Sequence, residues 1–382
     1  FPYTTLFRST DGNFIQQAIS VFEHFFPGEN VFVIFNFREQ QNYKENIPLY
    51  RYDQNDPELF IKIHKICLTH IIKNVVTHGI ATNFSLIFQY LKEKSLFSGH
   101  IYWIFWGYEL YNALGEKGKY KLVDGNSLFL KLTYIVPGPL NALVRRIVGR
   151  QLCSERLERA LPYVDYFCFW LPHDFELLHR FYVSHAKFKY FKYISSYKSD
   201  DKKADFKIYS KNVGRIMVNH QASLTGNHRI VLQKLSTISG IDEFEICTPL
   251  SYGSNYIRKS VLKIGKRCFG DKYKALLNLM PVNEYNQFLD SIPVAIFGAM
   301  RQEGAGNIMR LLKSGTKIYL RERNPLYLYY KEKGYLIFSF EKELNDVSDL
   351  RPLSEEEQLY NMQIAERTQV YYEDFMPSFF DK

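Results

Sequence analysis

Short apolar runs alternate with longer amphipathic segments along most of the chain. Apolar residues recur at helical spacing in residues 14–26 and 57–70, and compact runs of β-branched and aromatic residues follow at 31–37 and 71–77. A period near 3.6 predicts an amphipathic helix, and a short continuous apolar run predicts a buried strand. Strands that alternate with helices favour a parallel sheet with helices on both faces.

The alternation continues through the first half of the chain, stops, and then starts again. Residues 187–211 are dense in Lys, Asp, Ser and Tyr without a sustained apolar period, which predicts a connection between two domains. Before it we expect further strands at 101–106 and 163–170, and further helices at 83–94, 140–161 and 173–182. Beyond it we expect helices between strands at 215–219, 243–249, 274–279, 294–297, 317–321 and 335–340, and a final helix at 354–372.

The length of 382 residues exceeds one ordinary domain and suits two. We therefore predict an α/β protein with two Rossmann-like, doubly wound parallel-sheet domains, residues 10–200 and 201–350, that face each other across a cleft. Residues 351–382 are predicted to form a C-terminal helix that packs back on the first domain. This arrangement is called GT-B and is typical of glycosyltransferases that use nucleotide sugars. Ligands bind at the carboxyl ends of the strands in such sheets.

Residues 1–9 interrupt this pattern. The segment from Phe1 to Ser9 has no initiator Met and reads like the in-frame translation of a short-read sequencing adapter. We expect it to be a non-native segment and exclude it from the fold prediction. The first domain is then expected to lack its first β-strand.

Composition narrows the class of protein. Apolar residues make up 46% of the chain, which excludes wholesale disorder. No apolar run approaches the roughly 18–20 residues that a membrane-spanning helix needs. The five cysteines are scattered and form no C-x-x-C pair, so a zinc site or a disulfide framework is disfavoured and a reducing cytoplasm is expected.

Two polar positions follow predicted strands of the first domain. His78 comes directly after the run at 71–77, and Glu109 follows the strand at 101–106. Sugar transfer needs a base that deprotonates the acceptor hydroxyl, and either side chain can serve. The aromatic surroundings of Glu109 would raise its pKa and favour it as the base, with His78 positioning the acceptor or the donor phosphate. The structural alternatives are that His78 satisfies a loop and that Glu109 caps a helix N-terminus.

A glycine-rich turn at residues 300–308 joins a predicted strand to a predicted helix in the second domain. Gly304 and Gly306 let a ligand approach the free amides of the helix N-terminus, and Arg301 adds a charge, which predicts a seat for a diphosphate. The alternative is an ordinary tight turn. The chain has neither the spacing of a P-loop nor a G-x-G-x-x-G fingerprint, so ATPase and NAD-dependent functions are disfavoured.

The basic excess of the chain is concentrated in Lys117–Arg150. This segment has one acid, Asp124, and seven basic residues, Lys117, Lys119, Lys121, Lys131, Arg145, Arg146 and Arg150. Among its apolar residues are Leu128, Leu130, Leu132, Ile135, Leu140, Leu143, Val144 and Ile147. A basic and apolar surface suits the anionic face of a membrane. Nucleic acid is disfavoured as a partner because no known binding motif accompanies the charge, and a solvated face over a core helix is the structural alternative.

Taken together, the motifs resemble those of the TDP-N-acetylfucosamine:lipid II N-acetylfucosaminyltransferases (4-alpha-L-fucosyltransferases, glycosyltransferase family 56). The similarity extends over nearly the whole chain after Ser9. Matching positions are His78 and Gly79; Trp103, Trp106, Gly107, Glu109, Leu110 and Tyr111; Pro249–Gly253; Arg301, Gln302, Gly304 and Gly306; and Leu320, Arg321, Asn324 and Pro325. Asn219, His220, Gln221 and Pro293 depart from the family pattern, which bears on the identity of the donor sugar.

The resemblance implies transfer of an amino-deoxy sugar, similar to 4-acetamido-4,6-dideoxygalactose, from a dTDP-sugar donor to a polyprenyl-diphosphate-linked saccharide. The protein would work in bacterial surface polysaccharide assembly, peripherally bound to the inner face of the cytoplasmic membrane and without a cofactor or metal. Glu109 and His78 would be catalytic, and the acceptor side would comprise Trp103, Trp106, Gly107 and Tyr111. The donor side would comprise Asn227, Tyr252, Gly253, Arg301, Gln302, Gly304, Gly306, Asn307 and Arg321.

Two other functions stay open at this level. Nucleotide-sugar epimerases and transferases with other donors share the GT-B arrangement. An inactive module that binds a membrane surface is the third option, because the first strand is expected to be missing. Transfer requires a lipid-linked acceptor, whereas epimerisation does not.

Overall fold

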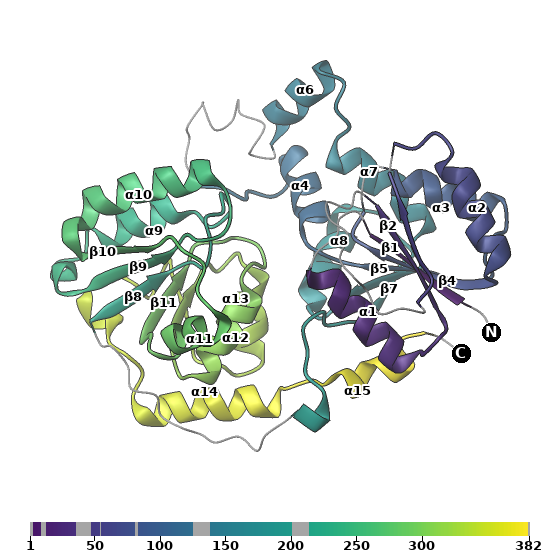
Figure 1. Cartoon of the computed structure of the whole chain (residues 1–382). Helices are drawn as coiled ribbons and strands as arrows, with labels where there is room; N and C mark the ends of the chain where they lie inside the picture. The colour runs from purple at the N-terminus through teal and green to yellow at the C-terminus, as the bar shows by residue number, and fades with distance from the viewer. Residues whose placement is uncertain are drawn as a thin grey trace. The chain divides into compact units, whose positions relative to one another are not determined.

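The computed structural model describes residues 3–8, 13–35, 47–53, 55–80, 83–124, 138–200 and 214–380, and its contacts divide them into two compact units (Figure 1). The first unit contains the described residues up to Lys119, those from Gly138 to Asp200, and those from Val370 onward. The second contains Tyr120–Asp124 and residues 214–369. The chain therefore passes between the two units more than once.

The first unit is built on a parallel sheet. Its described strands lie in the order β3-β2-β1-β4-β5-β6-β7, and every neighbouring pair is parallel. The strands are β1 (Tyr3–Arg8), β2 (Asn30–Phe35), β3 (Leu49–Tyr52), β4 (Ile72–His78), β5 (Ile101–Ile104), β6 (Tyr166–Phe169) and β7 (Lys187–Tyr190). The helices are α1 (Asn13–Phe25), α2 (Leu59–Thr69), α3 (Phe84–Glu93), α4 (Tyr108–Glu116), α6 (Pro139–Ile147), α7 (Cys153–Ala160), α8 (Pro172–Phe181) and α15 (Tyr372–Phe375).

Strand β1 lies in the middle of this sheet, which differs from the prediction that the first strand is missing. Leu6 is in register with Phe32 of β2 on one side and with Val76 of β4 on the other. The sequence Tyr-Thr-Thr-Leu-Phe-Arg is rich in aromatic and β-branched residues, which favour a pleated strand. Residues 3–8, which we excluded from the fold prediction, therefore fill the position that we expected to be empty.

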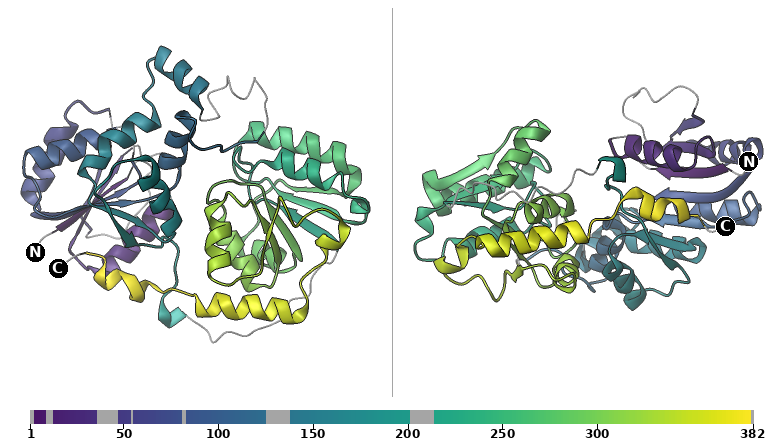
Figure 2. Two further views of the ribbon diagram at one scale, coloured as in Figure 1. Left: turned by 180° about the vertical axis from the view of Figure 1, so that it is seen from behind. Right: turned by 90° about the horizontal axis from the view of Figure 1, so that it is seen from below.

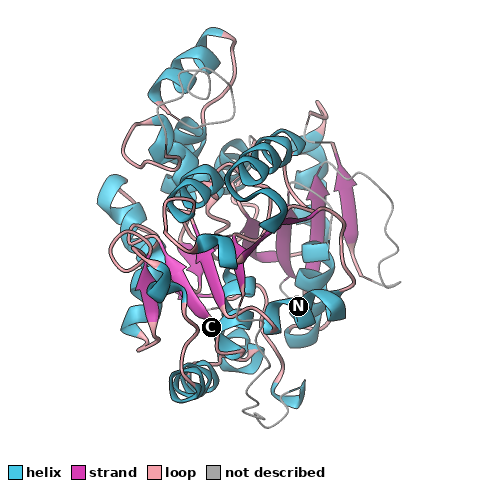
Figure 3. Cartoon of the chain, turned by 90° about the vertical axis from the view of Figure 1, so that its left-hand side faces the viewer, coloured by secondary structure: helices cyan, strands magenta, loops and turns pink. Residues whose placement is uncertain are grey.

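The second unit repeats the architecture. Its described strands lie in the order β10-β9-β8-β11-β12-β13, again all parallel. They are β8 (Arg215–Val218), β9 (Glu245–Pro249), β10 (Tyr273–Leu276), β11 (Val294–Phe297), β12 (Lys317–Leu320) and β13 (Ile337–Ser339). The helices are α9 (His228–Leu235), α10 (Asn255–Phe269), α11 (Val282–Asp290), α12 (Ala305–Lys313), α13 (Pro325–Glu332) and α14 (Glu355–Arg367). Figure 3 shows helices on either side of the strands.

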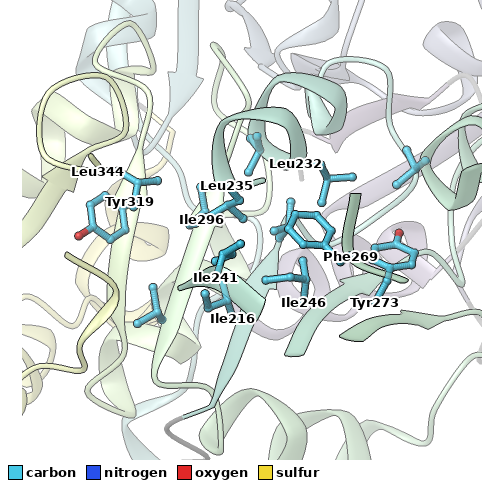
Figure 4. Packing of buried hydrophobic residues seen from close by; sticks show 14 of the residues in the cluster. Ile216, Leu232, Leu235, Ile241, Ile246, Phe269, Tyr273, Ile296, Tyr319 and Leu344 are labelled. Carbon is cyan, nitrogen blue, oxygen red and sulfur yellow. The ribbon is translucent and has the colours of Figure 1, made fainter. Parts of the chain in front are cut away.

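The core of the second unit lies between its sheet and the covering helices. Ile216, Ile246 and Ile296, from three neighbouring strands, belong to one buried cluster with Leu232 and Leu235 of α9 (Figure 4). Complete burial of such a side chain contributes about 1.5–3 kcal/mol to folding. This packing fixes the ends of β8, β9 and β11, where the loops of the candidate site begin.

Three segments differ from the predicted secondary structure. The predicted connection at 187–211 begins with strand β7, whose alternation of Lys and aromatic residues suits the edge of a sheet. The helix predicted at 140–161 is divided into α6 and α7 around Gly149, which has a positive φ of 70°. The predicted C-terminal helix is divided too, because α14 packs on α12 of the second unit and α15 joins the first unit (Figure 2).

Both sheets have one point at which the strand order reverses direction. It lies between β1 and β4 in the first sheet and between β8 and β11 in the second. Open α/β sheets bind ligands beside the carboxyl ends of the strands at this switch point. The residues after β4, β8 and β11 are therefore the first place to look for a functional site.

In the described residues, none of the helices is long and apolar enough to cross a bilayer.

Candidate functional site

Gly79 follows β4 at the switch point of the first sheet and packs directly on Glu109. Its backbone has a φ of +81°, and a Cβ atom at this position would lie 2.9 Å from Glu109 Oε1. Both the left-handed backbone and the close approach require glycine. The sequence His78-Gly79 thus lets the carboxylate of Glu109 lie against the end of β4.

Glu109 lies in the first turn of α4 and is only 2% exposed. Trp103 Nε1 donates a hydrogen bond to its Oε1 at 3.4 Å, and Oε2 has no hydrogen-bond partner among the described residues. Burial raises the pKa of Glu109 to about 7, although Trp103 and nearby backbone N–H groups oppose the shift. Its carboxyl therefore titrates near neutral pH, as a general base requires.

A narrow crevice, with no room for a water molecule, adjoins Glu109. One wall comes from α7, which the sequence analysis did not connect with the site. The residues that line the crevice beside Glu109 are Ile80, Tyr108, Cys153, Arg156 and Leu157.

His78 ends β4 and is 4% exposed. Its Nδ1 is hydrogen-bonded to the Tyr193 hydroxyl at 3.2 Å. The Tyr193 ring also packs on the ring of Trp106, with 4.8 Å between the ring centroids. Tyr193 lies in the segment that we predicted to be an interdomain connection, and no local sequence signal pointed to it.

Trp103 and Tyr111 are core residues rather than lining of an open cleft, contrary to the sequence prediction. Both are fully buried, and the Tyr111 hydroxyl donates a hydrogen bond to the buried Asp174 of α8. Trp103 holds the carboxylate of Glu109. The two aromatic residues therefore position α4 and its glutamate, while the half-buried Trp106 stays at the sheet edge. Gly107 is the N-cap of α4 with a φ of 96°.

Glu303 joins two loops at the switch point of the second sheet. Its buried carboxylate accepts hydrogen bonds from the side chains of Gln221, Ser223 and Thr225, which follow β8. Arg301 Nη2 lies 3.5 Å from Glu303 Oε2. Sequence reasoning missed Glu303, because its three hydrogen-bond donors are about 80 residues away along the chain.

The charge distribution around Glu303 favours its ionised form. Burial alone would raise the pKa of Glu303, but the charge of Arg301 and the ring of His220 outweigh burial, and the hydroxyl donors assist them, so the pKa falls to about 2. Burial lowers the pKa of His220, and it lowers the pKa of His228 to about 4. At neutral pH the cluster therefore holds one carboxylate and one guanidinium beside two neutral imidazoles.

Helix α12 presents its N-terminus beside this cluster. Its N-cap Gly304 has a φ of 73°, and a Cβ there would lie 2.7 Å from His220 Nδ1. Gly306 is exposed, with open space where a Cβ would stand. Asn307 Oδ1 accepts a hydrogen bond from Tyr285 at 2.9 Å. The first-turn amides of α12 are thus accessible to an anion.

The side-chain amide of Asn227, which we assigned to the donor site, is engaged by the protein itself. Its Nδ2 donates to the carbonyls of Leu122, Thr225 and Gly298 at 3.0–3.1 Å, and its Oδ1 accepts from the Asp124 amide at 2.8 Å. Its amide hydrogens are therefore engaged within the chain. The side chain fastens the segment Tyr120–Asp124 to the ends of β8 and β11.

Arg321 is also engaged by the protein itself. Its Nη1 donates to Asp124 Oδ2 at 2.6 Å, and its Nε donates to Glu341. Two carboxylates thus neutralise a guanidinium that is 9% exposed. We assigned Arg321 to donor binding. In the structure its guanidinium holds Asp124, at the end of the segment Tyr120–Asp124, and its charge is compensated.

Tyr252 and Gly253 lie in the turn after β9. The side chain of Tyr252 is 68% exposed. Gly253 has a φ of +108° and lies so close to Ala222 that a Cβ would be 2.4 Å from the Ala222 carbonyl oxygen. The glycine therefore lets this turn pair with the loop after β8. The exposed ring of Tyr252 is available for stacking at the same sheet edge. Gln302 is half-buried between Arg301 and Glu303.

Acidic and imidazole side chains do not gather into a metal centre in the part of the chain that the structure describes. No group of three or more His, Cys, Asp or Glu residues is placed there to hold an ion. Glu303, His220 and His228 lie near one another, but the carboxylate is already bound by hydroxyl and amide donors. The chemistry that these residues support is hydrogen bonding and charge compensation.

No family model matches this sequence, and comparison with curated proteins gives no match. Solved structures are similar in fold. They include a UDP-forming α,α-trehalose-phosphate synthase from Burkholderia vietnamiensis (9% identity, 99% of this chain and 98% of that chain, TM-score 0.60). They also include an E. coli trehalose-6-phosphate protein bound with UDP-2-fluoro glucose. The match to it covers 99% of this chain and 97% of that chain, at 9% identity and a TM-score of 0.59.

A sucrose-phosphate synthase from Thermosynechococcus elongatus is similar over 99% of this chain and 92% of its own, at 8% identity and a TM-score of 0.54. These structural neighbours are GT-B glycosyltransferases, and none of the three is an N-acetylfucosaminyltransferase. At such low identity the likeness concerns the fold alone. The predicted fold class is confirmed: the chain is an α/β protein with the GT-B fold.

Proposed function

We propose that the chain is a glycosyltransferase that takes its sugar from a nucleotide-sugar donor. The observation that carries this proposal is the accessible N-terminus of α12 at a sheet switch point, with Arg301 and Gly306 beside it, in a chain with the GT-B fold. Helix N-terminal amides and a guanidinium together suit a diphosphate.

The diphosphate of the donor would lie against the first turn of α12. Gly306 leaves room for phosphate oxygens to approach the amides, and Arg301 supplies the positive charge. Glu303 neutralises Arg301 in the free protein, so donor binding adds negative charge to a site that is already compensated. The amides of α12, rather than excess positive charge, would therefore carry much of the donor affinity.

Glu109 would act as the base. It accepts the proton of the acceptor hydroxyl while the hydroxyl oxygen bonds to the anomeric carbon and the bond from that carbon to the nucleoside diphosphate breaks. A pKa of about 7 suits this role, because the carboxylate is substantially ionised at neutral pH and still basic enough to take the proton. His78, at the end of the neighbouring strand, would contact the acceptor or the donor phosphate.

The substrates that we propose follow from the family resemblance. The donor would be a dTDP-linked amino-deoxy sugar, and the acceptor a saccharide on a polyprenyl diphosphate. The motif residues that support this proposal in the structure are Gly79 and Trp103, which position Glu109, and Arg301 and Gly304, which shape the donor turn.

The test is incubation of the full chain with a panel of nucleotide sugars and polyprenyl-diphosphate acceptors, read by mass spectrometry. We expect a glycosylated lipid product whose formation requires both substrates. A change of the nucleotide sugar without an acceptor would indicate an epimerase, and transfer from UDP-sugars alone would reject the dTDP donor. A protein that binds vesicles but gives no product would be a binding module.

A membrane surface is the partner that we propose for α6. Leu143 and Ile147 on this helix are 55% and 75% exposed, and Leu140 and Val148 are also exposed. The basic residues nearby are largely compensated, as in the pairs Arg145–Glu116, Arg146–Glu155 and Lys117–Glu158. The apolar face, more than the charge, would then attach the protein peripherally to the inner face of the cytoplasmic membrane. Lys131, Leu128, Leu130, Leu132 and Ile135 lie outside the described residues.

Replacement of both Leu143 and Ile147 by Asp should reduce co-sedimentation with liposomes by about tenfold or more, because each side chain would otherwise bury apolar area in the bilayer. Ile61→Asp on α2 is the matched control, since Ile61 is 69% exposed on another helix. Anionic lipid should increase binding only modestly. An unchanged double variant would remove α6 from the membrane contact.

A further inference from the structure

The C-terminal segment of the chain fixes the loop that follows β7. The Tyr372 hydroxyl accepts hydrogen bonds from Gln17 Nε2 at 2.9 Å and from the Ser195 amide at 3.1 Å, and it donates to the Tyr193 carbonyl at 3.0 Å. The Tyr372 amide in turn donates to the Ser196 carbonyl at 3.0 Å. One hydroxyl thus joins α1, the loop after β7 and the C-terminal segment, all within the first unit.

Two further contacts hold the same loop. The Ser195 hydroxyl donates to the Val370 carbonyl, and Lys198 Nζ forms an ion pair with Asp374 at 2.7 Å. The loop is therefore fastened at three successive places rather than at a single hydrogen bond. Its backbone position depends on residues almost 180 positions later in the chain.

The loop places the Tyr193 side chain on His78. Tyr193 OH lies 3.2 Å from His78 Nδ1, and the two rings meet edge to face at 5.6 Å. Trp106 also packs on the Tyr193 ring, with 4.8 Å between the ring centroids, and so limits its rotation. A hydrogen bond at Nδ1 fixes the orientation of an imidazole and favours one of its two tautomers.

We propose that Tyr193 and, through the Tyr193 carbonyl, Tyr372 are positioning residues for His78. The inference rests on the proposed function only in giving His78 a substrate to contact. Tyr193 sets the rotamer and the tautomer of the imidazole, and Tyr372 sets the position of Tyr193. Neither residue touches the reacting atoms.

The test uses the full chain with ¹⁵N-labelled histidine and the variants Tyr193→Phe and Tyr372→Phe. His78→Gln assigns the His78 resonances among the ten histidines. We expect a single tautomer of His78 in the wild type, a mixture of tautomers in Tyr193→Phe, and a smaller change in the same direction in Tyr372→Phe. Tyr90→Phe is the matched control, because the Tyr90 hydroxyl bonds His64 Nδ1 at 2.8 Å elsewhere in the same unit.

Activity gives a second readout. Tyr193→Phe should lower kcat by about 10- to 100-fold with little change in the donor KM, because it misplaces a group without removing it. Tyr90→Phe should leave both constants unchanged. Ser195→Ala, which removes only the bond to Val370, should give a weaker form of the Tyr372→Phe result.

Unchanged His78 resonances in Tyr193→Phe, with an unaltered melting temperature, would overturn the proposal. A shift in Tyr193→Phe but not in Tyr372→Phe or Ser195→Ala would overturn the role of the C-terminal segment. If no substrate pair supports transfer by the wild type, the proposed function fails, while the resonances still decide whether Tyr193 and Tyr372 position His78.

Discussion

Glu109 and Glu303 lie beside the switch points of the two sheets, and both side chains are almost wholly buried. Burial raises the pKa of each carboxyl, yet the results are opposite: about 7 for Glu109 and about 2 for Glu303. The ordinary value for both is 4.5. Similar burial thus gives one carboxyl that titrates at neutral pH and one that stays ionised.

The difference comes from the partners rather than from depth in the protein. Glu109 receives a long hydrogen bond from Trp103 and lies among aromatic rings, so desolvation dominates. Glu303 receives three side-chain hydrogen bonds and faces Arg301, so its charge is compensated. The first environment suits proton transfer, and the second suits a fixed charge that organises a loop.

The largest expected effect distinguishes these roles by turnover. Glu109→Gln keeps the shape of the side chain and removes the proton acceptor, so kcat should fall about 10²- to 10⁴-fold with donor binding intact. Glu303→Gln should instead leave kcat close to that of the wild type and strengthen donor binding, because it removes the counter-charge of Arg301. Steady-state kinetics with calorimetric donor binding measure both quantities.

His78→Ala serves as the reference for this pair. Normal turnover in Glu109→Gln together with an inactive His78→Ala would transfer the role of base to His78. If both variants stay active, the base is another residue, and the raised pKa of Glu109 has no catalytic meaning.

The pH dependence of stability is the second test, and it requires no substrate. Folding raises the pKa of Glu109, so this residue contributes to the free energy of unfolding at low pH. That contribution should fall by about 3 kcal/mol as pH rises from about 4.5 to about 7. A lowered pKa does the reverse, so the contribution of Glu303 should be lost as pH falls from about 4.5 toward 2, by a similar amount.

Urea unfolding at a series of pH values measures these slopes. As pH rises to 7, the free energy of unfolding of Glu109→Gln should increase relative to that of the wild type. As pH falls below 4, the free energy of unfolding of Glu303→Gln should increase relative to that of the wild type. Parallel curves for the wild type and either variant would show that the corresponding carboxyl has an ordinary pKa.

Arg301→Ala is the smallest of the three effects. It removes a charged hydrogen-bond donor from the proposed diphosphate seat, so donor affinity should fall by about 1–3 kcal/mol. It also removes the main counter-charge of Glu303 and should raise the pKa of that carboxyl. Arg301→Lys keeps the charge and is the control. Unchanged donor affinity by calorimetry would exclude Arg301 from the seat.

The sequence was informative where the signal is local. Apolar runs predicted β4, β9 and β11 to within two residues, and the glycine turn correctly indicated the N-terminus of α12. The sequence His78-Gly79 also marked the turn after β4. Only glycine fits at this position, because it packs on Glu109.

Long-range contacts could not be predicted in this way. Glu303 depends on Ser223 and Thr225, and His78 depends on Tyr193, at separations of about 80 and 115 residues that leave no periodic trace. The aromatic motif gave the right element but the wrong role for Trp103 and Tyr111, because a motif does not say which side chains the helix buries. Asn227 and Arg321 were assigned from the family resemblance, which does not show that they contact Gly298 and Asp124 within the chain.

The return of the chain to its first unit has a consequence for biosynthesis. Phe375, Met376 and Phe379 belong to the same buried cluster as Phe22 and Tyr102, so the hydrophobic interior that begins with α1 is complete only when the last described residues are present. A nascent chain therefore leaves the ribosome with that surface uncovered until residues 375–379 have also been synthesised. Premature termination after α14 would yield a polypeptide with an intact second unit and an unsealed first one, a species prone to aggregation and open to proteolysis.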